Sequence, residues 1–458
     1  MAGPRYIRTA RQSTGRFVEE KRVRLGLVGF GTVGTGVAKL ILEQADDIAA
    51  KMGVRPELAC VVDVDTETPR PVRLPDGVLT RDLSRLLGDP SIDIGIELVG
   101  GTGVAKEIQL SMLRAGKDVV TANKALLAEH GPELYRVAHE NGRCIAFEAT
   151  CAGGIPIITA IRTGLAANHI EAMYGIVNGT CNYILSNMTA GDEEFSDALA
   201  KAQERGFAEA DPTLDISGGD SAHKLAILAS MAFGCEIALE DIFVEGIEGV
   251  AKADIRYGCE MGYRLKLLAI AQRSAEGRIS LRVHPSFIAA DTSLARVNGS
   301  FNAIGVFGDA VGETLHYGRG AGMMPTASAV VADIVDVALG NSRSTFEHLR
   351  LKPRSEVKPI IEKIDESVTR FYIRVMAKDE PGVVARYGKI LGDHQISISG
   401  ALQHEGTGPG GTVPVVITTH RTQEGNMTAA LTELAKLDII SGSSVCIRIV
   451  DIPQDKDT

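Results

Sequence analysis

The hydrophobic and polar positions follow two periodicities in turn over the first third of the chain. Short apolar runs that suit buried strands begin near residue 23, and stretches with apolar residues at helical spacing follow them. VRLGLV precedes GTGVAKLILEQ in this way, and DVVTAN precedes ELYRVAHENG. Strands that alternate with helices predict a parallel sheet with helices on both faces. We therefore expect a doubly wound α/β domain over residues 22–150.

The pattern changes after residue 150. The helical stretch EEFSDALAKAQERG is mixed with the strand-like stretches HIEAMYGIVNG, ISLRVHPSFIA and NAIGVFG. This mixture predicts an α+β domain on a mixed sheet over residues 151–321. The long apolar helix expected at 322–340 can return to pack on the first domain. Residues 341–368 are charged and contain prolines, so we expect a linker there.

The C-terminal part of the chain, residues 369–453, has the order strand, helix, strand, strand, helix, strand. TRFYIRVMAK, VVARYGKILGD and QISISGALQHE give its first half, and VPVVITTHRT, MTAALTELAKL and SVCIRIVDI give the second. The β-α-β-β-α-β order is typical of a ferredoxin-like fold. The sequence thus predicts three folded units, preceded by a flexible extension at residues 1–21.

Composition and charge narrow the class of protein. The 458 residues are 45% hydrophobic and 23% charged, and we find no uninterrupted apolar run of transmembrane length. The net charge of −10 argues against nucleic acid as the main partner. The cysteines are scattered singly, which indicates neither a zinc site nor a disulfide framework and favours a reducing compartment. The arginine-rich start is also typical of a transit peptide but lacks an apolar face. We favour a disordered tail and a cytoplasmic protein.

A glycine motif stands between the first strand and the first helix. Its six residues are Gly29, Phe30, Gly31, Thr32, Val33 and Gly34, which satisfy G-x-G-x-x-G. The first glycine permits a tight turn, the second lets backbone approach a pyrophosphate, and the third lets helix and strand pack closely. The helix N-terminus also favours an anion. The motif predicts a Rossmann-type domain that binds a dinucleotide.

The residue at the end of the second strand bears on the choice of cofactor. Asp63 lies there, and a carboxylate at this point accepts hydrogen bonds from ribose hydroxyls and repels a 2′-phosphate. This favours NAD. Arg70 and Arg73 follow closely and are able to reach a phosphate, so NADP stays open.

A second informative stretch, AQERGFAEADPTLDISGGDSAHK, runs from residue 202 to residue 224 and combines carboxylates with a lysine. Asp220 and Lys224 are four residues apart on the expected helix, so they share a face and can form an ion pair. From spacing alone, an exposed ion pair of little energetic weight is the better interpretation.

These residues resemble the signature segment of the homoserine dehydrogenases. The matching positions of that segment are Ala202, Gly206, Asp211, Pro212, Asp215, Gly218, Asp220 and Lys224. The stretches GFGTVGTGV, TANKALLA, EATCAGGIPII and GRGAGMMPTASAVVADI are similar to the same family, so the resemblance covers most of the chain. The family often has another small apolar residue where this chain has Cys151.

The resemblance implies an NAD(P)-dependent enzyme that interconverts L-homoserine and L-aspartate 4-semialdehyde. Oxidation of an alcohol needs a base beside the oxygen and stabilisation of the developing alkoxide. By resemblance Lys224 transfers the proton, and Lys124 is a second cation near the nicotinamide and the reacting oxygen. The further roles implied are a ligand for the substrate ammonium (Glu209), a partner of the amine or the lysine (Asp220), a backbone contact to substrate (Gly206), a pocket residue (Asp215), a polar turn (Asn178, Gly179 and Thr180) and a cofactor contact (Gly322).

The resemblance also implies a site for a monovalent cation such as sodium. Its ligands would be the carboxylate of Glu148 and the backbone carbonyls of Cys151, Gly153 and Ile155. Oxygen ligands suit a hard cation. Only the carbonyl of Cys151 is needed, so the family's difference at this position puts little in doubt.

The C-terminal unit resembles an ACT domain, a module that senses amino acids, through KDEPGVVA at residues 378–385 and Ile396-Ser397-Ile398. This resemblance implies a homodimer or homotetramer and makes threonine the effector to test. A purely structural dimerisation module stays open. So do two other functions for the whole chain: a dehydrogenase of another small amino-acid aldehyde or hydroxy acid, and an inactive nucleotide-binding sensor.

Overall fold

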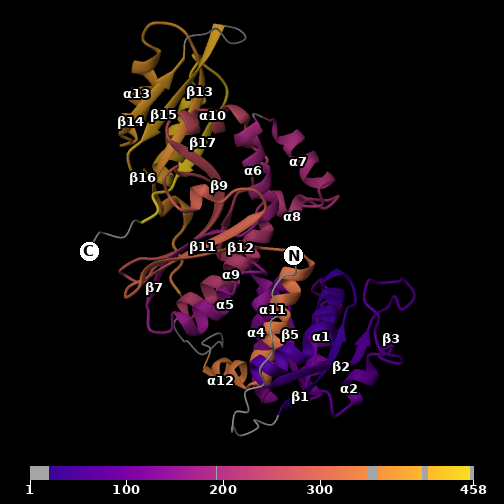
Figure 1. Ribbon diagram of the computed structural model, residues 1–458. Coiled ribbons are helices and arrows are strands. Elements are labelled where there is room, and N and C mark those ends of the chain that lie inside the picture. Colours follow the sequence, from indigo (N-terminus) through magenta and orange to yellow (C-terminus); the bar gives the residue numbers. More distant parts are fainter. Residues whose placement is uncertain (1–19, 192, 349–358, 405–410, 454–458) are drawn as a thin grey trace, which may run out of the picture.

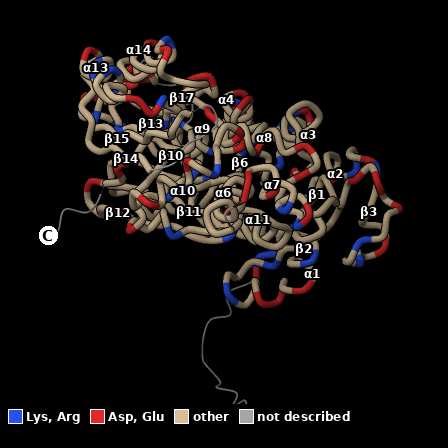
Figure 2. The backbone as a smooth tube through the Cα atoms, turned by 90° about the horizontal axis from the view of Figure 1, so that it is seen from above, with Lys and Arg blue, Asp and Glu red and all other residues tan. Residues whose placement is uncertain are grey.

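The computed structural model describes residues 20–191, 193–348, 359–404 and 411–453. Most of the extension expected at residues 1–21 therefore lies outside the described residues. Figure 1 shows the first unit in indigo at one end, the C-terminal unit in yellow at the other, and the second unit between them. Figure 2 shows acidic and basic residues interspersed over all three units.

The first unit is a six-stranded parallel sheet in the order β3-β2-β1-β4-β5-β6. Leu25 and Leu27 of its central strand are fully buried, because helices cover both faces of a doubly wound sheet. The strands are β1 (Lys21–Val28), β2 (Val54–Val62), β3 (Leu79–Thr80), β4 (Ile94–Glu97), β5 (Asp118–Thr121) and β6 (Ile145–Ala146). The helices are α1 (Thr32–Met52), α2 (Ser84–Gly88), α3 (Val104–Arg114) and α4 (Lys124–Glu140).

A helix from much later in the chain completes this unit. Helix α11 (Met323–Ala338) lies against α1 (Figures 1 and 2). The approach is close at Gly36, where an added Cβ would lie 2.9 Å from Met323 Cγ and 3.0 Å from Ala327 Cβ. Small residues on α1 and α11 therefore allow the two helices to pack closely.

The expected linker is wrong over its first part. Helix α12 (Asn341–His348) begins directly after Gly340, whose positive φ of 85° turns the chain. Phe346 is 2% exposed and packs edge to face on Tyr135 of α4, with the ring centroids 5.8 Å apart. One aromatic anchor thus ties a mostly polar segment to the first unit. Residues 349–358, also in the expected linker, lie outside the described residues.

The second unit is built on a sheet in the order β12-β11-β7-β9-β10, in which neighbouring strands are antiparallel, and β8 pairs in parallel with β10, so the sheet is mixed as predicted. Its strands are β7 (Ile170–Ile176), β8 (Phe243–Val244), β9 (Tyr263–Arg273), β10 (Ile279–Ala289), β11 (Phe301–Gly308) and β12 (Gly312–Arg319). Its helices are α5 (Ile157–Thr159), a π-helix (Ala160–Gly164), α6 (Gly179–Gly191), α7 (Phe195–Glu204), α8 (Thr213–Ile216), α9 (Gly219–Phe233) and α10 (Lys252–Glu260). Short 3₁₀ helices lie at Glu148–Thr150, Leu239–Asp241, Leu294–Arg296 and Ile364–Glu366.

The C-terminal unit has the predicted ferredoxin-like arrangement, with the sheet order β17-β13-β15-β14. Two helices cover one face of this sheet, and Phe371, Ile373 and Val375 of β13 point into the core between them. The elements are β13 (Val368–Lys378), α13 (Val383–Asp393), β14 (Ile398–Gln403), β15 (Thr412–Thr419), β16 (Thr422–Gln423), α14 (Glu424–Leu434) and β17 (Ile440–Ile449).

The second and third units share one sheet. Strand β17 pairs in parallel with β10, where Ser286 faces Arg448 and Phe287 faces Ile449. A single sheet of the order β12-β11-β7-β9-β10-β17-β13-β15-β14 therefore runs through both units. The C-terminal unit is joined to the second unit by backbone hydrogen bonds as well as by side chains.

Within the described residues, no single helix is long and apolar enough to cross a membrane. Helices α11 and α12 pass such a test together by length and composition only, with a bend of 85° between them. The same part of the chain holds no cluster of three or more His, Cys, Asp or Glu side chains arranged for a metal ion. Its seven cysteines are free thiols.

Candidate active site

The glycine motif forms a tight turn between β1 and α1. Gly29 has a φ of +96°, and a Cβ there would meet the backbone of Leu98 at 2.7 Å. A Cβ on Gly34 would lie 2.1 Å from the carbonyl oxygen of Gly29, so helix and strand approach too closely for any side chain. Gly31 is exposed at the start of α1, and the space around it is open. This arrangement fits a dinucleotide pyrophosphate at the helix N-terminus.

The side chain of Asp63 is turned back onto this glycine turn. Its carboxylate accepts hydrogen bonds from the backbone N–H of Phe30 and, at 2.8 Å, from that of Asp65. Arg70 lies beside it, with its guanidinium 5.1 Å from the centre of the Phe30 ring and 3.5 Å from the Asp65 carboxylate. The carboxylate favoured for ribose and the arginine able to reach a phosphate are thus neighbours.

Helix α9 supplies two of the charged side chains of the site. Gly218, in the left-handed region with φ +88°, precedes the helix, and Asp220 and Lys224 follow on one helical face. Lys224 Nζ donates to Asp220 Oδ2 at 2.6 Å and to the backbone carbonyl of Val177 at 2.7 Å. Asp220 is 5% exposed and Lys224 8%, so this i,i+4 pair is buried and is not the surface ion pair that spacing alone also allowed.

A second lysine reaches the same carboxylate from the nucleotide-binding unit. Lys124 begins α4, and its Nζ lies 3.1 Å from Asp220 Oδ1. Asn123 caps that helix by accepting a hydrogen bond from Leu126 N–H, which fixes the start of α4. Asp220 therefore bridges two ammonium groups from two different units.

The three charges alter each other's ionisation. Burial opposes the ionisation of Asp220, but the ammonium groups of Lys224 and Lys124 outweigh it and hold the pKa of this carboxyl well below its usual range. Burial also opposes the charge on Lys124, yet Asp220 outweighs that effect and raises the Lys124 pKa. The site thus holds an ionised carboxylate between two cations.

The turn before α6 adds neutral donors to this cluster. Asn178 Nδ2 donates to Asp220 Oδ2 at 2.8 Å and to Asp215 Oδ1 at 2.7 Å. Thr180 Oγ1 lies 3.2 Å from Asp215 Oδ2 and donates to the carbonyl of Phe207 at 2.6 Å. Asn178 is only 4% exposed. The amide group of Asn178 therefore fixes the carboxylates of Asp215 and Asp220 relative to each other.

Two residues that the resemblance assigned to substrate binding lie at the rim. Glu209 and Gly206 are exposed, and Gly206 has a positive φ of 71°. The Phe207 carbonyl between them accepts the Thr180 hydrogen bond, which links this loop to the cluster. Within the described residues, the Glu209 carboxylate has no hydrogen bond or ion pair to another side chain.

The expected cation ligands lie in the segment between β6 and α5. The carboxylate of Glu148 accepts hydrogen bonds from the N–H groups of Ile158 (2.9 Å) and Thr159 (2.8 Å) and from the Thr159 hydroxyl (2.6 Å). The carboxylate thus stabilises the start of α5. In the described chain, no backbone N–H donates to the carbonyls of Cys151 and Gly153, whereas the Ile155 carbonyl accepts from Ile157 N–H at 2.7 Å. Two of the three expected carbonyl ligands therefore accept no backbone hydrogen bond within the described residues.

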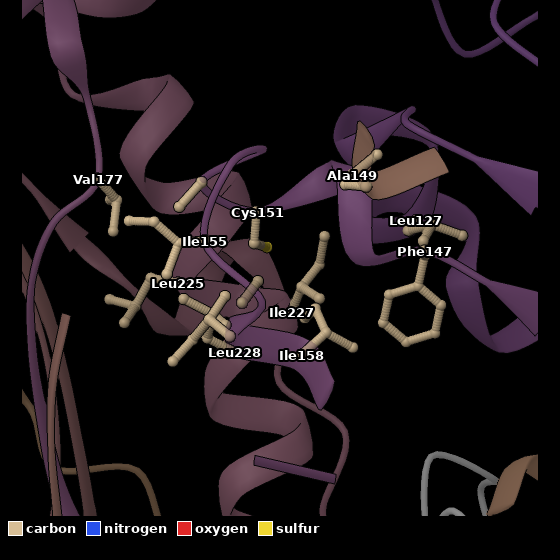
Figure 3. Close-up of a cluster of buried hydrophobic side chains, with 14 of the residues drawn as sticks. Leu127, Phe147, Ala149, Cys151, Ile155, Ile158, Val177, Leu225, Ile227 and Leu228 are labelled. Atoms are coloured by element: carbon tan, nitrogen blue, oxygen red, sulfur yellow. The ribbon is translucent and has the colours of Figure 1, made fainter. Parts of the chain in front are cut away.

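Apolar packing lies under the cluster and holds α9 in place. Figure 3 shows Leu225 and Leu228 of α9 grouped with Val177, Ile155 and Cys151. Cys151 is fully buried, and burial raises the pKa of its thiol to about 12. Its Sγ donates to the Lys224 carbonyl at 3.8 Å. Cys151 is therefore a packing residue, and its thiol is not reactive.

Gly322 lies beside the segment between β6 and α5 that holds the expected cation ligands. It is the N-cap of α11, with a φ of +121°, and its carbonyl accepts from Thr326 N–H at 3.1 Å. A Cβ on Gly153 would lie 3.0 Å from Thr326 Oγ1. The start of α11 thus packs directly on the expected cation-binding segment.

Comparison with known families matches all three units. The family model described as "Homoserine dehydrogenase, NAD binding domain" matches residues 29–148, "Homoserine dehydrogenase" matches 156–335, and "ACT domain" matches 371–438. A homoserine dehydrogenase of Pseudomonas aeruginosa is 44% identical over 434 residues, which cover 94% of this chain and 99% of that protein. The chain belongs to the homoserine dehydrogenase family.

Solved homoserine dehydrogenases have the same architecture. The structure from Thiobacillus denitrificans matches with a TM-score of 0.86 at 41% identity, covering 94% of this chain and 99% of that one. A hyperthermophilic archaeal homoserine dehydrogenase in complex with NADPH matches with a TM-score of 0.59 at 28% identity, covering 70% of this chain and 98% of that one. The predicted fold class is confirmed, and the chain is an NAD(P)-dependent oxidoreductase.

Two contacts of the lysine cluster of this homoserine dehydrogenase family member were not found by sequence reasoning. The Val177 carbonyl holds Lys224, and a backbone carbonyl has no sequence signature. Asn178 was assigned only to a polar turn, yet it donates to both Asp215 and Asp220. Its place directly after a buried strand, together with Gly179 and Thr180, was the available signal.

Proposed function

We propose that this chain oxidises L-homoserine to L-aspartate 4-semialdehyde and catalyses the reverse reduction, with Lys224 as the proton-transfer residue. The observation that carries the proposal is the Asp220 carboxylate, which lies 2.6 Å from Lys224 Nζ and 3.1 Å from Lys124 Nζ. An alcohol oxidation needs a proton acceptor and a positive charge at one oxygen. Two lysines held by one ionised carboxylate supply both.

The hydrogen bonds of Lys224 support its role in proton transfer. An ammonium group has three N–H bonds, and those to Asp220 and to the Val177 carbonyl use two of them. The third is available to the substrate oxygen. In the direction of reduction Lys224 gives this proton to the oxygen that becomes the hydroxyl of homoserine, and in oxidation its neutral amine takes the proton back. Asp220 stays ionised throughout and orients the amine, and Lys124 stabilises negative charge on the same oxygen.

The nucleotide-binding unit is suited to the dinucleotide, which supplies hydride acceptance in oxidation and hydride donation in reduction when it is bound. Its pyrophosphate would lie over Gly31, where the space is open, with Phe30, Thr32 and Val33 beside it. Lys124 and Gly322 would contact the nicotinamide side. We propose a preference for NAD because of Asp63, with Arg70 as the residue that also admits NADP.

Substrate binding would use the charges around the cluster. Homoserine carries an α-ammonium group, and Glu209 is an exposed carboxylate at the rim of the site. Asp215 would form part of the wall of the substrate pocket, because Asn178 and Thr180 hold its carboxylate in place. Gly206 would contribute its backbone. For sodium or another monovalent cation we propose the carbonyls of Cys151, Gly153 and Ile155 with Glu148, where a cation would stiffen the segment beneath Lys224.

The C-terminal unit supports a proposal of regulation. We propose that it binds an amino acid, with threonine the effector to test, at the loop of residues 378–382 before α13. Gly382 there has a positive φ of 92° and begins the helix. We further propose that the chain assembles as a homodimer or homotetramer.

The test of the catalytic proposal is homoserine-dependent reduction of NAD⁺ and of NADP⁺ by the wild type and by Lys224→Met. We expect the variant to lose at least about 100-fold in kcat with either cofactor. Lys201→Met is the matched control, because Lys201 of α7 pairs with Glu193, outside the cluster. Activity of Lys224→Met within about tenfold of the control would overturn the proton-transfer role. The ratio of kcat/KM for the two cofactors tests the preference for NAD.

A further inference from the structure

One arginine of the C-terminal unit is shared between that unit and the second unit. Arg448 of β17 is 8% exposed and binds Glu424 at the start of α14 through Nε (2.9 Å) and Nη2 (2.5 Å). Its remaining nitrogen, Nη1, lies 2.6 Å from Glu245 Oε2 of the second unit. The guanidinium also lies 4.9 Å from the ring centre of Phe243. One side chain thus contacts a helix of the ACT domain and the segment of residues 243–247.

The segment 243–247 is held on the sheet of the second unit. Phe243 and Val244 form β8, which pairs in parallel with Arg282 and Val283 of β10. Glu245 N–H then donates to the Val283 carbonyl at 2.8 Å. The segment is therefore an added strand with little freedom to move apart from β10, and Glu245 points from it to the ACT domain.

The same segment packs closely on the turn of residues 216–218. Ile247 N–H donates to the Ile216 carbonyl at 2.8 Å. A Cβ on Gly246 would lie 2.3 Å from that carbonyl oxygen, and one on Gly218 would lie 3.0 Å from Val244 Cγ1. Gly246 is thus needed because the two backbones touch, and Gly218 because of its φ of +88° and the Val244 side chain beside it. A shift of the segment must move the turn, since close-packed backbone cannot absorb it.

The turn of residues 216–218 connects the two carboxylates of the site. Asp215 directly precedes it, Gly219 and Asp220 follow it, and Asn178 holds both carboxylates. Asp220 in turn holds Lys224 and Lys124. From Arg448 to the catalytic cluster there are thus two steps, the ion pair to Glu245 and the backbone contact between the segment 243–247 and the turn.

We propose that Glu245 is a positioning residue, which through its ion pair with Arg448 sets the place of the Asp215–Asp220 turn and makes substrate binding depend on the state of the ACT domain. Several other side-chain links between the second and C-terminal units reach other elements, among them Tyr263 of β9, whose hydroxyl accepts a hydrogen bond from Arg370. Asp254 of α10 binds Tyr372 and Arg374, and Glu260 of α10 binds His404. The regulatory part of this inference rests on the proposed function, and the positioning part does not.

The test compares Glu245→Gln with Glu260→Gln. Both substitutions remove one carboxylate contact to the C-terminal unit from side chains of similar exposure, 44% and 40%, but Glu260 lies at the end of α10, away from the turn. We expect Glu245→Gln to lower kcat/KM for homoserine about fivefold, with the KM for the dinucleotide unchanged and the thermal midpoint equal to that of the control. A general loss of folded enzyme would instead lower kcat alike for both substrates.

Hydrogen exchange of the peptide that covers residues 213–220 gives a readout independent of turnover. We expect faster exchange there in Glu245→Gln, an intermediate rate in Glu245→Asp, and the wild-type rate in Glu260→Gln. Equal exchange in Glu245→Gln and Glu260→Gln would overturn the positioning role. If the chain does not oxidise homoserine, the proposed function fails and the exchange test still decides the role of Glu245.

Threonine provides the last arm of the test. If threonine changes wild-type activity, the change should be smaller in Glu245→Gln and intact in Glu260→Gln. An unchanged response in Glu245→Gln would overturn the coupling. If threonine has no effect on the wild type, the proposed effector is wrong. The KM and exchange results still test the positioning role of Glu245, because neither measurement uses threonine.

Discussion

Asp254 of α10 binds two residues of the ACT domain and so helps to hold this domain on the second unit. It is fully buried on α10, and its carboxylate accepts from Arg374 Nε (2.6 Å) and Nη2 (3.0 Å) and from the Tyr372 hydroxyl (2.9 Å). Asp254→Ala removes all three hydrogen bonds and leaves the Arg374 guanidinium, only 15% exposed, without a counterion. Removing one partner of a buried ion pair costs about 3–5 kcal/mol. Because Arg374 keeps some contact with water, we expect about 3 kcal/mol.

Native-state hydrogen exchange measures this loss locally, in peptides that cover residues 252–260 and 368–378. A local change of about 3 kcal/mol corresponds to exchange roughly 150-fold faster, since about 1.4 kcal/mol is a factor of ten. Local measurement is needed because a chain of several domains does not have to unfold in one step. Asp254→Asn keeps a carbonyl acceptor, so an intermediate rate is expected.

Asp451→Asn is the control for this prediction. Asp451 is 40% exposed and lies 3.3 Å from Arg370 and from Arg421, so its ion pairs are screened by water. We expect its substitution to change the local free energy of opening by less than about 1 kcal/mol. If exchange in Asp254→Ala rises no more than in Asp451→Asn, the buried network does not hold the two units together and the reasoning is wrong.

Three further predictions concern the catalytic and cofactor residues. Asp220→Asn should lower kcat at least about 100-fold, because Lys224 and Lys124 lose their shared carboxylate; steady-state rates within about tenfold of the wild type would contradict this. The folded-state pKa of Asp220 is depressed, so its stabilisation is present above its unfolded pKa of about 3.9 and is lost as the pH falls further. The difference in thermal midpoint between wild type and Asp220→Asn should therefore shrink below about pH 4, and a constant difference would refute the linkage. Gly34→Ala should weaken dinucleotide binding at least about tenfold in a fluorescence titration, because its Cβ would lie 2.1 Å from the Gly29 carbonyl; unchanged affinity would show that the turn adapts.

Local signals in the sequence were enough for the nucleotide-binding fold. The strand, the glycine turn and the helix of residues 23–52 are consecutive, so their periodicity and their special backbone positions can be read together. The Asp220–Lys224 contact is local in the same sense, since four residues make one helical turn. The burial of this pair was not local, because it depends on α4 and on Val177, the residue that follows β7.

Contacts between distant segments were beyond the sequence. The pairing of β10 with β17 joins residues about 160 positions apart through backbone groups, which every residue carries. The resemblance brought Lys124 and Lys224 to one site but gave no hint that a single carboxylate holds both. Helix α12 was missed because its sequence is mostly polar, and its contacts with the fold, the buried ring of Phe346 and the Arg343–Asp118 ion pair, are with distant segments.

The return of α11 to α1 bears on how the chain matures during synthesis. The strands of the nucleotide-binding unit have all been translated by residue 146, but the face of α1 that carries Gly36 is covered only when residues 323–338 follow. At about 5–20 residues per second, this surface would wait roughly 10 to 40 s on the ribosome. During that interval the nascent unit exposes an apolar stripe that chaperones recognise, and a chain cut off before α11 would keep it exposed for good.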